Sequence, residues 1–304
     1  MPITDSIDLA GAATIELGKS WQPVTTDYGI GLLIVRLYKE KSIEGLTLGR
    51  LKKSFPDTVD LRSLIRTLLQ RGVLRKNRDF RGNVYNIVGK TEYLSEEILC
   101  AVDPFAYTSH LSAMAYHGLT NRIPSTIFYS TPQNQKWSSF ARKKMQTDLG
   151  EDVDEYIKEF MPRLTQIRFA RINKHPVHKY ASVHTGAFKS VKGKVLRVST
   201  IGRTFLDMVR APQFCGGINH VIEVYKAHAT QYEQLVVADI DQHGTLIDKT
   251  RAGYLLDEQC GIKNNPVIDN WAKAVQRGGS RKLDPTSEYS PNYSERWCLS
   301  LNVT

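Results

Sequence analysis

The chain has 304 residues, of which 41% are hydrophobic and 24% are charged, with a formal net charge of +10. This composition is typical of a soluble globular protein and excludes a disordered chain. The longest apolar run, residues 30–35, is too short to cross a bilayer, which takes about 18 or more apolar residues. The length predicts two domains, and the excess of positive charge indicates a polyanionic partner.

The first residues carry acids and lack the basic segment of a secretory signal, so we expect a cytoplasmic protein with no membrane partner. The four cysteines match neither a CxxC metal site nor a dense disulfide framework, because they are widely spaced. They are Cys100, Cys215, Cys260 and Cys298. We expect them to be small core residues, and we expect no metal and no cofactor.

Residues 1–24 show only weak periodicity, with a possible short helix. Apolar residues at helical spacing predict a helix over residues 27–41 and a second over 47–55, which Pro56 would end. The third predicted helix begins after Asp57 or Thr58 and is the most regular. Its apolar residues recur at i, i+3, i+4, i+7 and i+8, and they are Leu61, Leu64, Ile65, Leu68 and Leu69.

Residues 73–88 are predicted to form two strands around a turn at residues 78–82. Three short helices and a basic hairpin indicate a winged helix-turn-helix domain, which we place at residues 1–92. Residues 44–90 hold eleven Lys or Arg against four Asp or Glu, a net charge of +7. The alternative is a winged helix that binds another protein, with the charges on a solvated face.

The third helix is expected to read base edges in the major groove of DNA, and the hairpin to contact phosphates. The predicted DNA-binding residues are Arg62, Ser63, Arg66 and Thr67 on the helix and Arg75, Lys76, Arg78 and Arg81 on the hairpin.

Residues 105–132 are predicted to form a helix, a turn and a strand at the centre of a second domain, residues 93–304. Asp103 or Thr108 is the expected helix cap, Gly118 the expected end, and Pro124 bars any continuation. The apolar face of the helix comprises Leu111, Met114, Ala115 and Leu119. The expected fold is therefore α+β, a winged helix-turn-helix followed by a larger mixed α/β domain.

Residues 133–162 begin basic and turn acidic, as an exposed helix or an insertion would. Residues 163–197 then hold nine Lys or Arg, three His and no acid, and such a run is self-repelling unless a polyanion is near. Phe169, Tyr180 and Phe188 offer stacking surfaces. This second nucleic-acid or antitoxicity surface would include Arg168, Arg171, Lys174, Lys179, Lys189, Lys192 and Lys194. The alternative is a hairpin whose outward residues are basic.

Three histidines in this run, His175, His178 and His184, are spaced like metal ligands, but the surrounding cations would repel a metal ion. Four helices are predicted between residues 200 and 261. Arg203 and Asp207 lie one turn apart on the first of them. Such a pair contributes only about 0.2–0.5 kcal/mol if exposed, so a packing role is expected. No HExxH, GxSxG or GxxxxGK[ST] motif is present, and we expect no enzymatic activity.

The sequence LRSLIRTLLQRGVLRKNRDFRGNVYNI (61–87) resembles the winged-helix half of AbiEi-family antitoxins from AbiE (type IV) toxin-antitoxin systems. AYTSHLSAMAYHGLTNRIPSTIFYSTP (106–132) is similar to the family segment in which SHLSAL-x-x-HGL leads to a strand ending in TP. Blocks at 198–209, 246–261 and 280–303 follow in the same order. In the first of these blocks, Gly202 stands where the family pattern has an acidic residue. The resemblance covers roughly residues 28–303.

This resemblance implies an antitoxin that represses its own operon and takes part in phage defence. It would bind double-stranded operator DNA and counter a nucleotidyltransferase-type toxin through its C-terminal domain, without a stable complex. It would be a monomer in solution or bind cooperatively on DNA. Two alternatives stay open: a winged-helix regulator of a defence operon that neutralises no toxin, and an RNA-binding protein.

Overall fold

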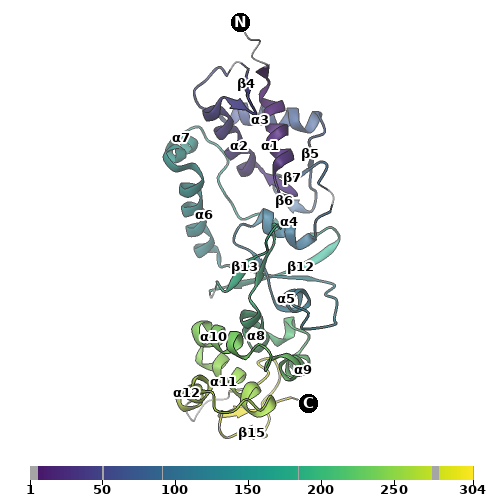
Figure 1. Ribbon diagram of the computed structural model, residues 1–304, viewed down its shortest axis with the longest axis vertical. Helices are drawn as coiled ribbons and strands as arrows, with labels where there is room; N and C mark the ends of the chain where they lie inside the picture. The colour runs from purple at the N-terminus through teal and green to yellow at the C-terminus, as the bar shows by residue number, and fades with distance from the viewer. Residues whose placement is uncertain (1–5, 50, 91, 184, 276–280, 304) are drawn as a thin grey trace. The chain divides into compact units, whose positions relative to one another are not determined.

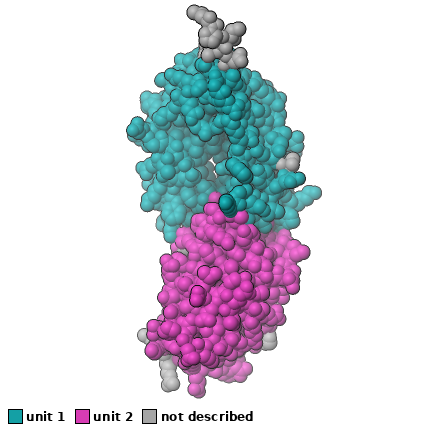
Figure 2. Space-filling view, in the orientation of Figure 1, with its two compact units in different colours: residues 1–106, 132–176, 192–196 teal, residues 107–131, 177–191, 197–304 magenta. Residues whose placement is uncertain are grey.

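The computed structural model describes residues 6–49, 51–90, 92–183, 185–275 and 281–303. The fold is mixed α+β (Figure 1). The chain divides into two compact units (Figure 2). Unit 1 comprises residues 1–106, 132–176 and 192–196, and unit 2 comprises residues 107–131, 177–191 and 197–304. This division differs from the boundary expected between residues 92 and 93, because later segments complete the N-terminal unit.

Unit 1 combines short sheets with helices packed around one core. Its strands are β1 (Ser6–Ile7), β2 (Val24–Thr26), β3 (Ser42–Ile43), β4 (Leu46–Leu48), β5 (Leu74–Lys76), β6 (Phe80–Arg81), β7 (Val84–Ile87), β10 (Arg168–Phe169) and β11 (Arg171–Ile172). Its helices are α1 (Leu9–Lys19), α2 (Asp27–Glu40), α3 (Thr58–Gln70), α4 (Ser95–Val102), α6 (Asn134–Leu149) and α7 (Val153–Lys158). The sheets have the strand orders β1-β4-β3, β2-β7-β5 and β10-β6.

The helix predicted at residues 27–41 and the one predicted to begin after Asp57 or Thr58 are confirmed as α2 and α3. The Asp57 side chain caps α3 by accepting hydrogen bonds from the amides of Val59 and Asp60. The weak helical pattern near the N-terminus is α1, whose buried alanines pack in the same core as α2 and α3. Each of these helices has apolar residues at helical spacing and a side chain that caps its first turn.

The helix predicted over residues 47–55 is wrong. The chain forms β4 instead, and no helix occupies the described residues 49 and 51–55. Glu44 and Gly45 both have positive φ, of 48° and 81°, as the central residues of a type I′ hairpin turn do. This turn pairs β3 with β4, and β1 pairs with the other edge of β4. Strand pairing therefore overrode the helical periodicity.

The segment after residue 133 completes the core of unit 1. Helix α6 contributes Met145 and Leu149, and Tyr156 and Met161 follow from α7 and the chain beyond it. The Tyr28 hydroxyl donates a hydrogen bond to the Asp148 carboxylate at 2.9 Å. The segment expected to be an exposed helix or an insertion therefore has one face buried.

Unit 2 joins a sheet to a bundle of helices. Its strands are β8 (Tyr107–Thr108), β9 (Ile127–Pro132), β12 (His175–Ser182, which begins in unit 1), β13 (Phe188–Ser190) and β14 (Arg197–Ser199). They have the order β12-β9-β8-β14-β13, and β11 pairs with the first residues of β12 within unit 1. The helices are α5 (His110–Tyr116), α8 (Ile201–Arg210), α9 (Ile218–His228), α10 (Glu233–His243), α11 (Leu246–Tyr254) and α12 (Pro266–Ala274). Strands β15 (Tyr293–Ser294) and β16 (Leu299–Ser300) pair near the C-terminus.

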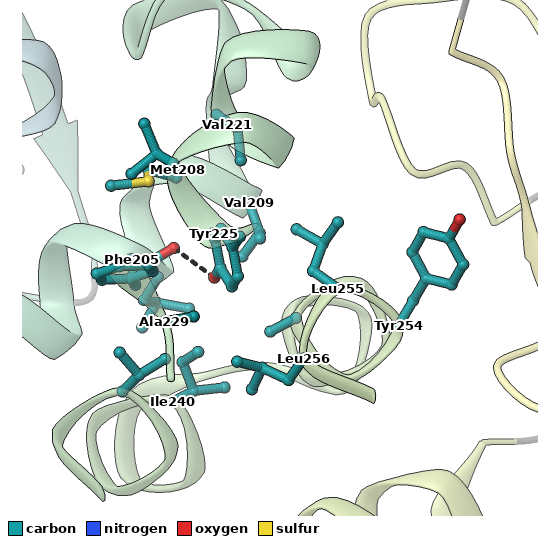
Figure 3. Close-up of a cluster of buried hydrophobic side chains, with 14 of the residues drawn as sticks. Phe205, Met208, Val209, Val221, Tyr225, Ala229, Ile240, Tyr254, Leu255 and Leu256 are labelled. Atoms are coloured by element: carbon teal, nitrogen blue, oxygen red, sulfur yellow. Dashed lines mark hydrogen bonds between the residues drawn. The ribbon is translucent and has the colours of Figure 1, made fainter. Parts of the chain in front are cut away.

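The helix, turn and strand predicted over residues 105–132 are confirmed as α5 and β9. Gly118 ends the helix with a φ of 68°. The cap is Ser109, not Asp103 or Thr108, and Thr108 instead belongs to β8. Met114 and Leu119 enter the core of unit 2, where the Tyr225 hydroxyl donates to the Phe205 carbonyl at 2.9 Å (Figure 3).

All four cysteines are free thiols. Among the described residues, no helix is both long enough and apolar enough to span a membrane.

Candidate nucleic-acid interface

Helix α3 presents a polar, basic face to solvent. Arg62, Ser63 and Arg66 are exposed, and Thr67 is half-buried with its hydroxyl donating to the Ser63 carbonyl at 3.0 Å. The opposite face of the helix is buried in the core of unit 1 through Leu61, Leu64 and Leu68. The 3.6-residue period therefore separates the predicted base-reading residues from the apolar stripe.

The β5–β7 hairpin carries the second group of predicted DNA-binding residues, and Arg75, Lys76, Arg78 and Arg81 are all exposed. Within the described residues, none of these four, nor Arg62 or Arg66, has an ion pair or a side-chain hydrogen bond. Six unpaired cations on one helix face and one hairpin suit a polyanionic ligand.

The buried Asn77 side chain shapes the tip of this hairpin. Its amide nitrogen donates to Asn86 Oδ1 at 2.9 Å, and its Oδ1 accepts from the Asp79 amide at 3.0 Å. The second contact is an Asx turn, which asparagine favours. Asn77 was not among the predicted site residues, although an asparagine two residues before Asp79 is a sequence signal for such a turn.

The predicted turn at residues 78–82 contains a further strand, β6. It pairs antiparallel with β10, with Phe80 opposite Phe169 and Arg81 opposite Arg168. The Asp79 carboxylate accepts from the Asn173 amide at 2.9 Å and forms an ion pair with Arg171 at 3.6 Å. Part of the second predicted surface thus lies directly against the hairpin within unit 1.

The rest of that second surface is divided between the two units. Arg168, Arg171, Lys174, Lys192 and Lys194 belong to unit 1, whereas Lys179 and Lys189 belong to unit 2. All seven are exposed. Residues 163–197 therefore do not form one continuous surface of a single compact unit.

The aromatic residues expected to stack on bases pack against protein instead. The Phe169 ring lies 5.2 Å from that of Phe80, and the Phe188 ring is stacked 4.9 Å from that of Tyr107. The Tyr180 ring lies 4.8 Å from that of His110. Each of these rings therefore has an aromatic protein neighbour, and base stacking by them stays a prediction.

His184 lies outside the described residues, His175 is exposed and His178 packs against Phe214. Within the described part of the chain, no three His, Cys, Asp or Glu side chains are grouped so that they could hold a metal ion.

The N-terminal end of α3 adjoins an acidic segment. The Thr58 hydroxyl donates to the Glu159 carbonyl at 2.9 Å, and residues 151–159 contain five acids. One of them, Asp152, forms an ion pair with Lys39 at 2.5 Å. Because these acids repel phosphates, the hairpin side of α3 is the favourable approach for a polyanion.

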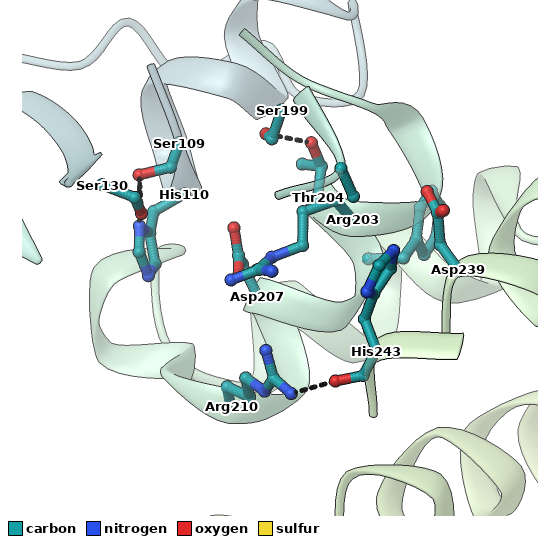
Figure 4. Close-up of polar contacts among 12 residues, drawn as sticks. Ser109, His110, Ser130, Ser199, Arg203, Thr204, Asp207, Arg210, Asp239 and His243 are labelled. Carbon is teal, nitrogen blue, oxygen red and sulfur yellow. Dashed lines mark hydrogen bonds and ion pairs between the residues drawn. The ribbon is translucent and has the colours of Figure 1, made fainter. Parts of the chain in front are cut away.

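Unit 2 contains a buried polar cluster around α8 (Figure 4). Arg203 Nε lies 2.8 Å from Asp207 Oδ1, and both side chains are only 1% exposed. Burial by itself lowers the Arg203 pKa, but Asp207, Tyr107 and Tyr180 together outweigh it and raise that pKa. The pair is fully enclosed, in a far less polar setting than an exposed helix surface, and the packing role expected for it stays a prediction.

His110 belongs to the same cluster. Its Nδ1 lies 2.8 Å from the Ser109 hydroxyl, which accepts from the Ser130 hydroxyl at 2.9 Å. Its backbone φ is 51°, a left-handed conformation that is uncommon for residues other than glycine. Burial lowers the His110 pKa to about 4. Because these groups are buried, they cannot reach a macromolecular ligand, and the exposed cations of unit 1 remain the better candidate site.

No family model matches the chain, and no curated protein matches it. Among solved structures, the crystal structure of the RV2827C protein from Mycobacterium tuberculosis aligns with a TM-score of 0.46 and 14% sequence identity. The alignment covers 95% of this chain and 90% of that one.

Proposed function

We propose that the chain is a DNA-binding repressor that acts as the antitoxin of a type IV toxin-antitoxin system. Unit 1 binds operator DNA as a winged helix-turn-helix, with α3 in the major groove. The strongest support is the group of six unpaired cations on the α3 face and the adjoining hairpin. Arginine suits both base reading and phosphate binding, because its fork of hydrogen-bond donors matches guanine edges and phosphates.

The order of elements supports the winged-helix assignment. If the inserted strands β3, β4 and β6 are set aside, the order of elements along the chain is α1, β2, α2, α3, β5 and β7. The strands among them form a sheet with the order β2-β7-β5. A helix, a strand, two helices and a two-stranded wing in this order are typical of a winged helix-turn-helix, a fold in which the third helix and the wing contact DNA. The antitoxin part of the proposal rests on the sequence resemblance.

A comparison of two duplexes tests base reading by Arg66. We expect the wild-type chain to prefer the DNA upstream of its own gene over a random-sequence duplex. Arg66→Ala should remove about 1–3 kcal/mol of that preference, the usual contribution of a bidentate base contact. Fluorescence anisotropy at a fixed salt concentration measures both affinities.

Arg142→Ala is the matched control, because Arg142 is an exposed arginine on α6 of the same unit. Equal losses of affinity on the two duplexes for Arg66→Ala would assign Arg66 to the phosphates and contradict base reading.

Antitoxicity is tested separately, in cells that express the neighbouring nucleotidyltransferase-type gene. Arg66→Ala should restore growth as well as the wild-type chain does, because the toxin is countered through the C-terminal region. Failure of the wild-type chain to restore growth would reduce the proposal to a transcriptional regulator.

A further inference from the structure

Two arginines lie opposite each other in a strand pair of unit 1. In the β6–β10 ribbon, Arg81 is the direct partner of Arg168. Side chains at such positions leave the same face of the ribbon, with Cβ atoms about 5 Å apart. Both arginines are exposed, and neither has a partner side chain among the described residues. Two like charges are therefore held together without a counterion.

The opposite face of the ribbon explains why the chain holds this arrangement. Phe80 and Phe169 pack edge to face with ring centroids 5.2 Å apart, and Phe80 is 6% exposed. The Asp79 carboxylate fixes the chain beyond β10 through the Asn173 amide at 2.9 Å. Because like charges directly opposite destabilise a strand pair, these contacts keep β6 and β10 paired against the repulsion between Arg81 and Arg168.

A hollow of about 260 Å³ adjoins the ribbon at Arg81, and Arg163, Thr165 and Gln166 also line it. The Asp27 carboxylate, which also lines the hollow, already accepts hydrogen bonds from the Tyr85 hydroxyl at 3.0 Å and from Asn83 Nδ2 at 2.5 Å. The hollow thus places two arginines, Arg81 and Arg163, beside a carboxylate that already accepts two hydrogen bonds.

We propose that Arg81 and Arg168 together bind one phosphate of the nucleic-acid backbone. The inference rests on the proposed DNA-binding function and extends its interface. The phosphate contact of the β5–β7 hairpin thus also includes a residue of β10, a segment that is distant from the hairpin in the sequence. The phosphate relieves the repulsion between the two guanidinium groups, and each donates charge-assisted hydrogen bonds to it.

The test uses the full-length protein and a labelled DNA duplex of random sequence, with affinity measured over a series of salt concentrations. Arg81→Ala, Arg168→Ala and the double variant are compared with Arg142→Ala, which removes the same charge from α6. We expect each single variant to weaken binding. We expect the double variant to lower the salt slope by about 0.9, the value for one phosphate. The two losses should not add, because both arginines bind the same group.

Thermal melting without DNA checks folding. Arg81→Ala and Arg168→Ala should leave the melting temperature unchanged or raise it, because each relieves the like-charge pair. A lower melting temperature in both variants would overturn the claim that the pair is held under repulsion.

The binding outcomes separate the two proposals. If the wild-type chain shows no salt-dependent binding, the DNA-binding function itself fails. If the wild-type chain binds while Arg168→Ala matches Arg142→Ala, the function stands and the shared phosphate site is overturned. Additive losses from Arg81→Ala and Arg168→Ala would also overturn the shared site, because they would assign the arginines to separate phosphates.

Discussion

The same types of side chain have opposite environments in the two units. On α3, Arg62 and Arg66 are exposed and unpaired, so their charges are available to a ligand. On α8, Arg203 is enclosed beside Asp207, where removing one partner would leave an uncompensated buried charge. The local sequence does not reveal that Arg203 is enclosed, because an arginine on an amphipathic helix is ordinarily exposed.

His110 makes a pH-dependent contribution to stability. Its folded pKa is about 4 against 6.5 for the free side chain, because burial disfavours the charged ring and the charge of Arg203 adds to this effect. The folded state therefore binds fewer protons than the unfolded state between these values. His110 therefore contributes its full stabilisation only above pH 6.5. As the pH falls from 6.5 toward 4, the free energy of unfolding decreases, by about 3 kcal/mol for the whole difference between the two pKa values.

His110→Asn should reduce the loss of unfolding free energy between pH 7.5 and pH 5, because asparagine does not titrate and tolerates left-handed backbone. Urea unfolding at the two pH values measures this difference independently of the absolute stability. The control is His175→Asn at an exposed histidine, which should keep the wild-type difference. An unchanged difference in His110→Asn would show that His110 does not cause it.

Among the helices, the close packing of α8 against α10 depends on Gly202. A β-carbon at this position would overlap the Leu235 carbonyl oxygen and the Asp239 carboxylate. The Thr200 hydroxyl at the start of α8 also donates to Asp239 Oδ2 at 2.5 Å. This contact gives a physical reason for a glycine at position 202.

Two glycine-to-alanine substitutions in helices should have opposite effects. Gly202→Ala should destabilise the chain by about 1–3 kcal/mol through overpacking against α10. Gly18→Ala in α1 should stabilise it by up to about 1 kcal/mol, because alanine is the better helix former and no atom lies within 4 Å of the added carbon. Chemical denaturation of both variants measures whether the free energy of unfolding falls or rises in each. Stabilisation by Gly202→Ala would contradict the close contact.

On the scale of the molecule, the two units are interleaved along the sequence. The core of unit 1 takes Met145, Leu149, Tyr156 and Met161 from beyond residue 132, and β6 takes its pairing partner β10 from residues 168–169. The boundary expected between residues 92 and 93 would cut through these contacts. Fragments designed from the sequence alone would therefore remove part of a core.

A fragment of residues 1–92 should lack the cooperative unfolding transition of the intact chain, because it loses Leu149 and Tyr156 from the core that α2 and α3 share. Circular dichroism during thermal melting, together with hydrogen exchange, would measure this loss. The full-length chain is the reference. A sharp transition with native-like amide protection in the fragment would show that residues 1–92 fold alone.

The sequence by itself determined the elements with strong local signals. Periodic leucines and the Asp57 cap gave α3, and Gly118 marked the end of α5, because caps, turns and amphipathic periods act over a few residues. It also placed Arg62 and Arg66 on the exposed face of α3. Only the tertiary structure decided that β4 replaces a helix, that Arg81 lies opposite Arg168 and that Arg203 is enclosed. These outcomes depend on pairing and packing between distant segments, which a local pattern does not encode.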